Sequence, residues 1–227
     1  MTVVVLMPAY NEEKTISTTL EGVFLIPEVN HVVVIDDGSA DATADIARKA
    51  GATVVRSDKN RGKGAALQLG VEKLAAESFE FDIIMFLDAD LGSSAREAGH
   101  LPGPVMRGLA DMTVGILPKV PGSGGFGVVR DLARSAIREH GGGYDAQAPL
   151  SGQRALNREC LQAVLPFADG YGVEVAMTIK ALKRNMRVFE MMVDMQHRTT
   201  GKDLPGFIHR GKQYLDVHRT IRQLTRE

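Results

Sequence analysis

Two aspartates follow an apolar run in the stretch FDIIMFLDAD, which ends at residue 90. Side chains at the spacing of Asp88 and Asp90 point to the same side of an extended strand. Two carboxylates that close repel each other unless a cation lies between them. Oxygen ligands of this kind suit Mg²⁺ or Mn²⁺, whose remaining positions can be filled by diphosphate oxygens. The competing interpretation is a helix cap followed by a solvated turn.

Two other polar stretches follow apolar runs earlier in the chain. DDGS, residues 36–39, comes after HVVVI, where a carboxylate could accept hydrogen bonds from a ribose or a base. NRGKG, residues 60–64, contains glycines that permit close approach of a ligand, and Lys63 could meet phosphate charge. It is not a Walker A loop, because GxxxxGK[ST] is absent. Each stretch could equally be an ordinary surface turn.

Glu174 in GYGVE and His197 after the run MRVFEMMVDM are the remaining candidates. A carboxylate at the start of a helix is favoured by the helix dipole, and it could also serve as a base in a site. A lone histidine is usually structural. Neither residue is decisive by itself.

Composition limits the classes of protein to consider. The 227 residues are 44% hydrophobic, enough for one large domain, or for a domain with a tail. A net charge of -1 gives no indication of nucleic-acid binding. A single cysteine, Cys160, excludes a disulfide framework and a cysteine zinc cluster. The apolar run near the start is short and has no basic region before it, so it predicts a buried strand, not a signal peptide. We therefore expect a cytoplasmic protein.

Apolar runs and helical patterns alternate through the first 90 residues, which predicts a parallel sheet with right-handed crossovers. Asn11 is expected to cap the first helix, with Glu12 and Glu13 in its first turn. The predicted strands are residues 3–7, 32–35, 52–56 and the run before Asp88. The predicted helices follow Asn11, cover 41–50 and follow the glycine-bounded turn that begins the stretch 60–76.

The second half is less regular. The predicted elements are a strand in DMTVGIL, a glycine-rich stretch 118–127, helices over 128–139 and 157–165, a helix ending at 185, a strand ending at His197 and an amphipathic helix from Leu204. Between them lies the glycine-rich loop 141–153, and loops of this length are usually functional or disordered.

Together PAYNEE, DDGS, GKG and LDAD, each after a successive predicted strand, resemble the motifs of GT-A fold nucleotide-sugar glycosyltransferases. The likeness is densest over residues 3–92 and is nearest to the family 2 type of polyprenyl-phosphate glycosyltransferases. It implies an α/β fold with a Rossmann-like, mostly parallel central sheet, helices on both faces, a smaller acceptor-side region and a C-terminal helix. One domain would contain a nucleotide-binding half (1–92), an acceptor and metal half (93–200) and a helical tail (201–227).

The resemblance also implies roles for individual residues. The turn Pro8–Ala9–Tyr10 and Glu12 would hold the nucleoside, and Asp37 would contact the base. The residues expected to bind nucleotide or donor are Pro8, Ala9, Tyr10, Glu12, Asp37, Lys63, Asp88, Ala89, Asp90, Gly152, Tyr171 and Glu174. The expected catalytic residues are Glu174, Asp90 and Lys63, and the expected metal ligands are Asp88, Asp90 and His197.

The segments GSGGFGVVRDLAR, QAPLSGQRAL, LPFADGYGVEVAM and MQHRT are similar to those of glucosyl-3-phosphoglycerate synthases, which are retaining enzymes that use UDP-glucose. By that likeness Glu174 binds donor sugar hydroxyls and His197 completes the metal shell. Imidazole suits Mn²⁺ better than Mg²⁺. Val129 stands where that family has a threonine that binds the acceptor phosphate, and Gly127 where it has an arginine. This difference speaks against 3-phosphoglycerate as the acceptor.

The expected activity is therefore metal-dependent transfer of a sugar, with glucose favoured, from a UDP-sugar to an unidentified acceptor, with Mn²⁺ or Mg²⁺ as cofactor. The alternatives are a polyprenyl-phosphate sugar transferase using a UDP- or GDP-sugar, a glucosyl-3-phosphoglycerate synthase-like enzyme, and a non-catalytic nucleotide-sugar sensor. PAYNEE replaces the glycine-rich signature of nucleotidyltransferases and dehydrogenases. Stereochemistry stays open, because Glu174 would be the base of an inverting enzyme or a sugar ligand in a retaining one.

Residues 202–227 contain more basic than acidic side chains. A basic amphipathic helix can lie on an anionic membrane surface, where lipid-phosphate acceptors reside, so the protein could act at the inner face of the membrane. The alternative interpretation is a helix that packs on the domain or forms a homodimer. The acceptor is accordingly expected to be a small molecule or a lipid phosphate.

Overall fold

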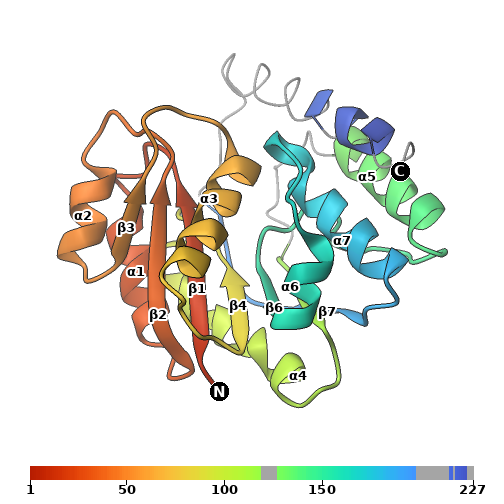
Figure 1. Cartoon of the computed structure of the whole chain (residues 1–227), viewed down its shortest axis with the longest axis horizontal. Coiled ribbons are helices and arrows are strands. Elements are labelled where there is room, and N and C mark those ends of the chain that lie inside the picture. The colour runs from red at the N-terminus through yellow and green to blue at the C-terminus, as the bar shows by residue number, and fades with distance from the viewer. Residues whose placement is uncertain (119–126, 198–214, 217, 224–227) are drawn as a thin grey trace.

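Residues 1–118, 127–197, 215–216 and 218–223 are described in the computed structural model, which is drawn in Figure 1. The described part contains one seven-stranded sheet. Its strands are β1 (Val3–Ala9), β2 (Val29–Asp36), β3 (Thr53–Arg56), β4 (Ile83–Phe86), β5 (Met112–Ile116), β6 (Arg154–Asn157) and β7 (Val188–Met192). Their order across the sheet is β3-β2-β1-β4-β6-β5-β7.

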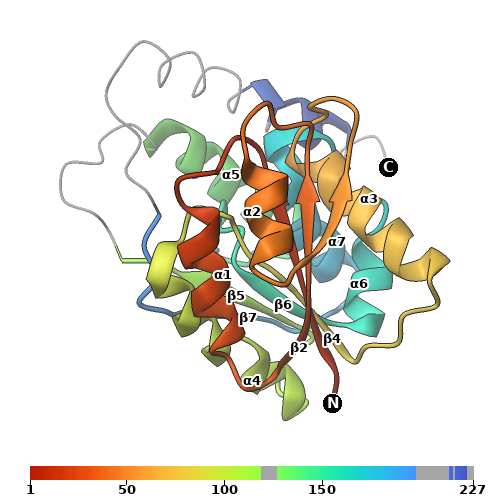
Figure 2. The ribbon, with the colours of Figure 1, turned by 90° about the vertical axis from the view of Figure 1, so that its left-hand side faces the viewer.

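Helices cover both faces of the sheet (Figure 2). The helices are α1 (Ile16–Phe24), α2 (Thr43–Lys49), α3 (Lys63–Ala76), α4 (Pro102–Met106), α5 (Gly127–His140), α6 (Arg158–Val164), α7 (Val173–Lys183) and the 3₁₀ segments η1 (Gly92–His100) and η2 (Gly170–Gly172). The first face packs against α1, α2 and η1, and the second against α3, α6 and α7. The predicted α/β architecture is confirmed.

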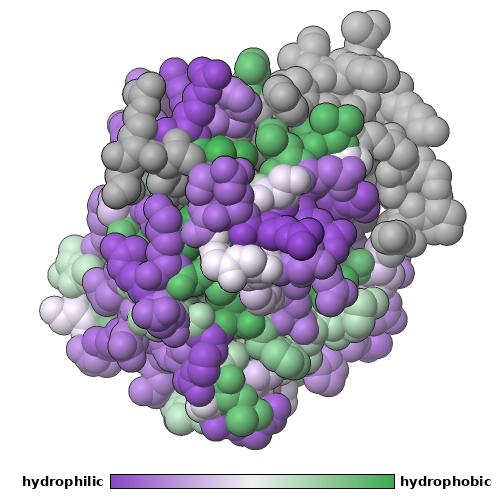
Figure 3. Space-filling model, turned by 90° about the vertical axis from the view of Figure 1, so that its right-hand side faces the viewer, coloured by the Kyte–Doolittle hydropathy of each residue, from purple (hydrophilic) through white to green (hydrophobic). Residues whose placement is uncertain are grey.

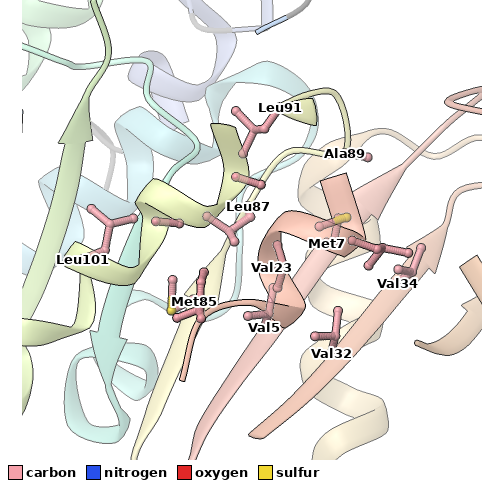
Figure 4. Packing of buried hydrophobic residues seen from close by; sticks show 14 of the residues in the cluster. Val5, Met7, Val23, Val32, Val34, Met85, Leu87, Ala89, Leu91 and Leu101 are labelled. Carbon is pink, nitrogen blue, oxygen red and sulfur yellow. The ribbon is translucent and has the colours of Figure 1, made fainter. Parts of the chain in front are cut away.

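The central strand β1 is buried on both faces. The side chains of Val5 and Met7 enter the cluster shared with α1 and η1, which Figure 4 shows from close by. Val4 and Leu6 enter the cluster on the opposite face, beside α3. A strand covered on both sides needs successive apolar residues instead of an alternation, so the run VVVLM predicts it correctly.

The sheet is parallel through its first half and mixed in its second. β1 runs parallel to β2 and β4, and β2 runs parallel to β3. β6 lies antiparallel between β4 and β5, and the edge strand β7 runs parallel to β5. β6 is not predicted from the sequence, because four residues after a glycine-rich loop show too little alternation to be distinguished from the helix that follows.

The predicted start of the first helix is wrong. α1 begins at Ile16, and Glu12 and Glu13 precede it. Asn11 adopts a left-handed backbone conformation with φ of 55°, and its side chain accepts a hydrogen bond from the Ala40 amide at 2.9 Å. Asn11 therefore joins two loops at the edge of the sheet instead of capping a helix, because asparagine tolerates positive φ and its amide can bond locally.

The end of the last predicted strand also differs from the structure. β7 ends at Met192, so His197 lies in the segment that follows it. Asp88 and Asp90 similarly come after β4, which ends at Phe86. The three side chains are therefore placed by loops at the sheet edge, and the alternation of a strand does not explain their convergence.

Most of the predicted helix from Leu204, including Phe207 and Ile208, lies outside the described residues. Residues 215–216 and 218–223 are helical. In this part Thr220 is buried, and Ile221 packs against the cluster of α5 and α7. The packing interpretation fits these residues, while membrane contact and dimer formation stay predictions.

No helix in the described part of the chain is long and apolar enough to cross a membrane. On the face of the molecule drawn in Figure 3, hydrophilic residues cover most of the described surface, and hydrophobic residues form smaller areas between them.

Candidate active site

The loops that follow β1 and β2 meet at one edge of the sheet. The parallel register sets Ala9 beside Asp36, so both strands end at the same level. The Asn11 amide donates to the Ser39 hydroxyl at 2.9 Å, and the Glu12 amide donates to the Thr43 hydroxyl at 2.8 Å. These bonds hold the PAYNEE turn against the loop that follows β2. Binding sites of open α/β sheets form at this edge.

Asp88, Asp90 and His197 come together at the same edge. Each offers one ligand atom, and these atoms lie within 4.8 Å of one another. His197 Nδ1 is 2.9 Å from Asp90 Oδ1, and its Nε2 is 3.8 Å from Asp88 Oδ2. A backbone bond from Gln196 to the Ser94 hydroxyl, 3.0 Å long, holds the segment that carries the histidine. Two carboxylates and an imidazole suit Mn²⁺ or Mg²⁺, and the imidazole favours Mn²⁺.

Lys63 connects this carboxylate group to Glu174. Its Nζ lies 2.6 Å from Asp88 Oδ1 and 2.7 Å from Glu174 Oε1. Lys63 is the first residue of α3, and Glu174 stands in the first turn of α7. The Glu174 side chain is only 6% exposed, and those of Lys63 and Asp88 are 19% and 22% exposed. Carboxylates from two different segments therefore share one ammonium.

Two glycines make this approach possible. A Cβ at Gly152 would fall on the Lys63 ammonium and within 2.9 Å of the Asp88 carboxylate. A Cβ at Gly64 would fall on the Ala168 carbonyl. The missing side chains let α3 pack against the segment before α7 and leave room for the ammonium. Gly152 thus has a packing role, and the predicted contact with the donor stays a prediction.

Charges in the site shift the pKa values of its groups. Burial alone would raise the pKa of Asp88, but Lys63 and His197 outweigh it and bring that pKa down to about 2. Burial would lower the pKa of Lys63, and the charges of Asp88 and Glu174 raise it above its usual value. Burial would also lower the pKa of His197, but the hydrogen bond with Asp90 and the charge of Asp88 outweigh burial and raise that pKa.

Asp37 organises the NRGKG loop. Its carboxylate accepts hydrogen bonds from the backbone amides of Arg61 at 2.9 Å and Gly62 at 2.7 Å. The residue is buried. Because Lys63 follows directly, these bonds fix the start of α3 and the direction of the lysine side chain. The predicted contact of Asp37 with a base stays a prediction.

Gln153 is a member of the site that the sequence does not indicate. Its Nε2 donates to Asp88 Oδ2 at 2.6 Å, and its Oε1 accepts from the Asp88 amide at 3.1 Å. The antiparallel pairing of Phe86 with Arg154 brings the two residues together. No spacing in the sequence could have revealed this contact, because it depends on the unpredicted strand β6.

Loop 141–153 is anchored at several points. The Glu190 carboxylate of β7 accepts the amides of Gln147 and Ala148, both at 2.8 Å. Arg134 of α5 forms a two-pronged ion pair with Asp145 in the loop. Closure of the loop over a donor would have to break these contacts. They favour a fixed wall beside the site over a lid that closes on the donor.

The other predicted nucleotide-binding residues lie around this centre. Pro8 and Ala9 end β1, and Tyr10 is 46% exposed at the sheet edge. Ala89 is buried, and its carbonyl accepts from the Thr19 hydroxyl. Tyr171 belongs to η2, but its side chain lies outside the described residues. The structure thus brings together Lys63, Asp88, Asp90, Gly152, Glu174 and His197. Pro8 and Ala9 at the end of β1, and Tyr10, Glu12 and Asp37 in the loops after β1 and β2, lie at the same edge of the sheet.

Known proteins share this fold. A family model described as glycosyl transferase family 2 matches residues 4–165. The chain belongs to this family. Its predicted class, a glycosyltransferase with the GT-A fold, is confirmed at the level of the family.

Curated relatives and solved structures support the assignment. The chain is 33% identical to glucosyl-3-phosphoglycerate synthase of Mycobacterium tuberculosis over 211 residues, covering 81% of this chain and 61% of the relative. It is 30% identical to the glycosyltransferase AglJ of Haloferax volcanii, covering 88% of this chain and 65% of the relative. It therefore spans less than two thirds of the length of both. An uncharacterized protein of Methanocaldococcus jannaschii is 32% identical, with 83% and 79% covered.

The crystal structure of the Mycobacterium tuberculosis synthase with Mn²⁺, UDP and glucosyl-3-phosphoglycerate superposes with a TM-score of 0.80 at 29% identity. The match covers 98% of this chain and 79% of that chain. A structure of the same synthase with Mg²⁺ and UDP gives a TM-score of 0.79.

Proposed function

We propose that the protein transfers glucose from UDP-glucose to an acceptor in a reaction that depends on Mn²⁺ or Mg²⁺. The observation that carries this proposal is the convergence of Asp88, Asp90 and His197 beside the Lys63–Glu174 ion pair at the sheet edge. The similar Mycobacterium tuberculosis synthase binds UDP-glucose together with Mn²⁺, which supports the same donor here.

Asp90 and His197 would be the principal metal ligands, with Asp88 beside them. Their donor set of carboxylate oxygens and an imidazole nitrogen fits the ion, and the three ligand atoms already lie within 4.8 Å of one another. A divalent cation bound there would stabilise the negative charge that develops on the departing diphosphate. Gln153 and Lys63 hold the Asp88 carboxylate in place through bonds of 2.6 Å each.

Lys63 and Glu174 would act on the donor from the other side. The lysine adds positive charge near the diphosphate, and its bond to Glu174 fixes the orientation of that carboxylate. We assign Glu174 to the donor sugar hydroxyls, because its buried position in the first turn of α7 is preorganised and ion-paired. A sugar-binding role agrees with the retaining alternative raised by the sequence.

The acceptor is proposed to differ from 3-phosphoglycerate. Val129 is buried in the cluster between α5 and α7, so its side chain packs in the core. Gly127, which stands where the synthases have an arginine near that threonine, has no side chain to offer. A small molecule or a lipid phosphate that is recognised through other groups remains the proposed acceptor class.

Calorimetric titration with UDP, GDP, UDP-glucose, UDP-N-acetylglucosamine and GDP-mannose, each with Mn²⁺ and with EDTA, tests the donor. We expect Mn²⁺-dependent binding of UDP and tighter binding of UDP-glucose, both abolished in Asp90→Asn. His197→Ala should weaken binding less than Asp90→Asn does. Binding that is unchanged by EDTA or by Asp90→Asn would refute the metal site, and preference for GDP would refute the donor.

A further inference from the structure

Arg154 is the largest fully buried side chain in the described part of the chain. It begins β6 and directly follows Gln153. Its Nε donates to the Ser151 carbonyl at 2.8 Å, and its Nη1 donates to the Thr178 hydroxyl at 3.0 Å. Nη2 has no hydrogen-bond partner among the described residues. Nη1 also contacts the Met112 sulfur at 3.4 Å, so the groups that this cation donates to are all neutral.

A buried charge in such surroundings is unfavourable for folding. Removing a cation from water costs several kcal/mol, and an apolar residue of similar volume is often neutral or stabilising at such a position. Burial lowers the pKa of the Arg154 guanidinium, and the charges of Glu174 and Glu190 act against that shift. Arginine still stays protonated in proteins. Stability alone therefore does not account for an arginine at this place.

Two of the groups that Arg154 contacts, the Ser151 carbonyl and the Thr178 hydroxyl, belong to segments on the two sides of the active site. Ser151 lies near the end of the anchored loop and precedes Gly152 and Gln153, which contact Lys63 and Asp88 as described above. The position of the Ser151 carbonyl thus sets where the backbone of Gly152 can lie.

The other end of the link leads to the carboxylate proposed to bind the sugar. Thr178 lies one turn after Glu174 on α7, and its hydroxyl donates to the Glu174 carbonyl at 3.0 Å. The same hydroxyl accepts from Arg154, so one oxygen relays the contact to the first turn of the helix. The Arg154 side chain on β6 thus connects the loop that contains Ser151 with the first turn of α7.

We propose that Arg154 is a positioning residue for the donor-sugar side of the site. By joining Ser151 to Thr178, it fixes the Gly152–Gln153 backbone relative to the first turn of α7, and so fixes the distance between the metal-binding carboxylates and Glu174. This inference rests on the proposed function for the identity of the donor, and its structural part can be tested without a donor.

The first test measures the affinities of UDP and UDP-glucose, both with Mn²⁺, for wild type, Arg154→Met, Arg154→Lys and Thr178→Val. Arg154→Met should lose about tenfold of the affinity for UDP-glucose, the effect of displacing one hydrogen bond to a charged group, while UDP binding changes by less than about twofold. Arg154→Lys should recover part of the loss. Ile179→Val, a buried change on the same helix, should alter neither affinity.

Combining Arg154→Met with Thr178→Val tests whether both act through one link. The losses should then not add, because removing either end breaks the same connection. Equal losses for UDP and UDP-glucose in Arg154→Met, or additive losses in the double variant, would overturn the positioning role.

Amide hydrogen exchange of the ligand-free protein provides the readout that needs no donor. Arg154→Met and Thr178→Val should both speed exchange in peptides covering 148–153 and 173–178, with α6 unchanged. If wild type bound neither UDP nor UDP-glucose, the proposed donor would be refuted. The exchange rates would still test whether Arg154 connects the two segments. Unchanged exchange in both segments would overturn the inference.

Discussion

Replacing Lys63 with methionine should destabilise the metal-free protein strongly. The substitution leaves Asp88 and Glu174, whose carboxylates lie 2.6 and 2.7 Å from the Lys63 Nζ, without their shared cation. Removing one partner of a buried ion pair costs about 3–5 kcal/mol. We take about 3 kcal/mol, because Lys63 and Asp88 keep some exposure to solvent. For a chain of this size the loss corresponds to a fall in Tm of about 6–12 °C.

Lys73→Met is the matched control on the same helix. Lys73 forms an ion pair with Glu77, but both side chains are about half exposed, at 44% and 50%. Such pairs contribute about 0.3–0.5 kcal/mol, so the Tm should fall by about 2 °C or less.

Manganese adds a second readout to this comparison. Without the repelling ammonium, Mn²⁺ should bind Lys63→Met more tightly than wild type, and it should raise the Tm of the variant by more. Thermal unfolding followed by circular dichroism, with Mn²⁺ and with EDTA, measures both effects. Equal Tm values for the Lys63 and Lys73 variants, or an unchanged Mn²⁺ response, would refute the assignment of Lys63 as the counter-ion of the site.

Two further substitutions have defined outcomes. Gly152→Ala should weaken Mn²⁺-dependent UDP binding by about tenfold or more, because its Cβ would fall on the Lys63 ammonium, whereas Gly127→Ala meets no atom within 4 Å and should leave binding unchanged. Hydrogen bonds from Arg187 outweigh burial and lower the pKa of Asp111, so this pair stabilises the fold above about pH 4, and the contribution is lost as the pH falls through the lowered pKa. In Arg187→Gln, urea unfolding at pH 7 and pH 3 should show a smaller loss of unfolding free energy on acidification, and an unchanged loss would count against the pair.

Most of the first half of the fold can be predicted from the sequence. The run VVVLM and the run before Asp88 are apolar at successive positions, which is the requirement of a strand covered on both faces. The alternation with helical patterns then requires parallel strands, whose carboxyl ends lie at one edge. The polar motifs after these strands had to meet there, so the location of the candidate site follows from local patterns.

Local patterns fail to predict the structure where contacts with a residue distant in the sequence determine a residue's conformation. Asn11 has the chemistry of a helix cap, but its side-chain oxygen accepts a hydrogen bond from the Ala40 amide and its φ is positive. The short strand β6 gives almost no periodic signal, and it exists because β4 and β5 supply hydrogen bonds on both of its sides. In each case tertiary contacts outweigh a weak local preference.

The sequence by itself determined the fold class, the strand-end carboxylates and the family, because burial period and strand direction are encoded over a few neighbouring residues. The tertiary structure alone decided the geometry of the site. Asp90 and His197 are 107 positions apart and still meet at 2.9 Å. The ion pair of Lys63 with Glu174 and the buried link of Arg154 to α7 likewise depend on how separate segments pack, since distances between remote side chains are set by the whole core and by no local pattern.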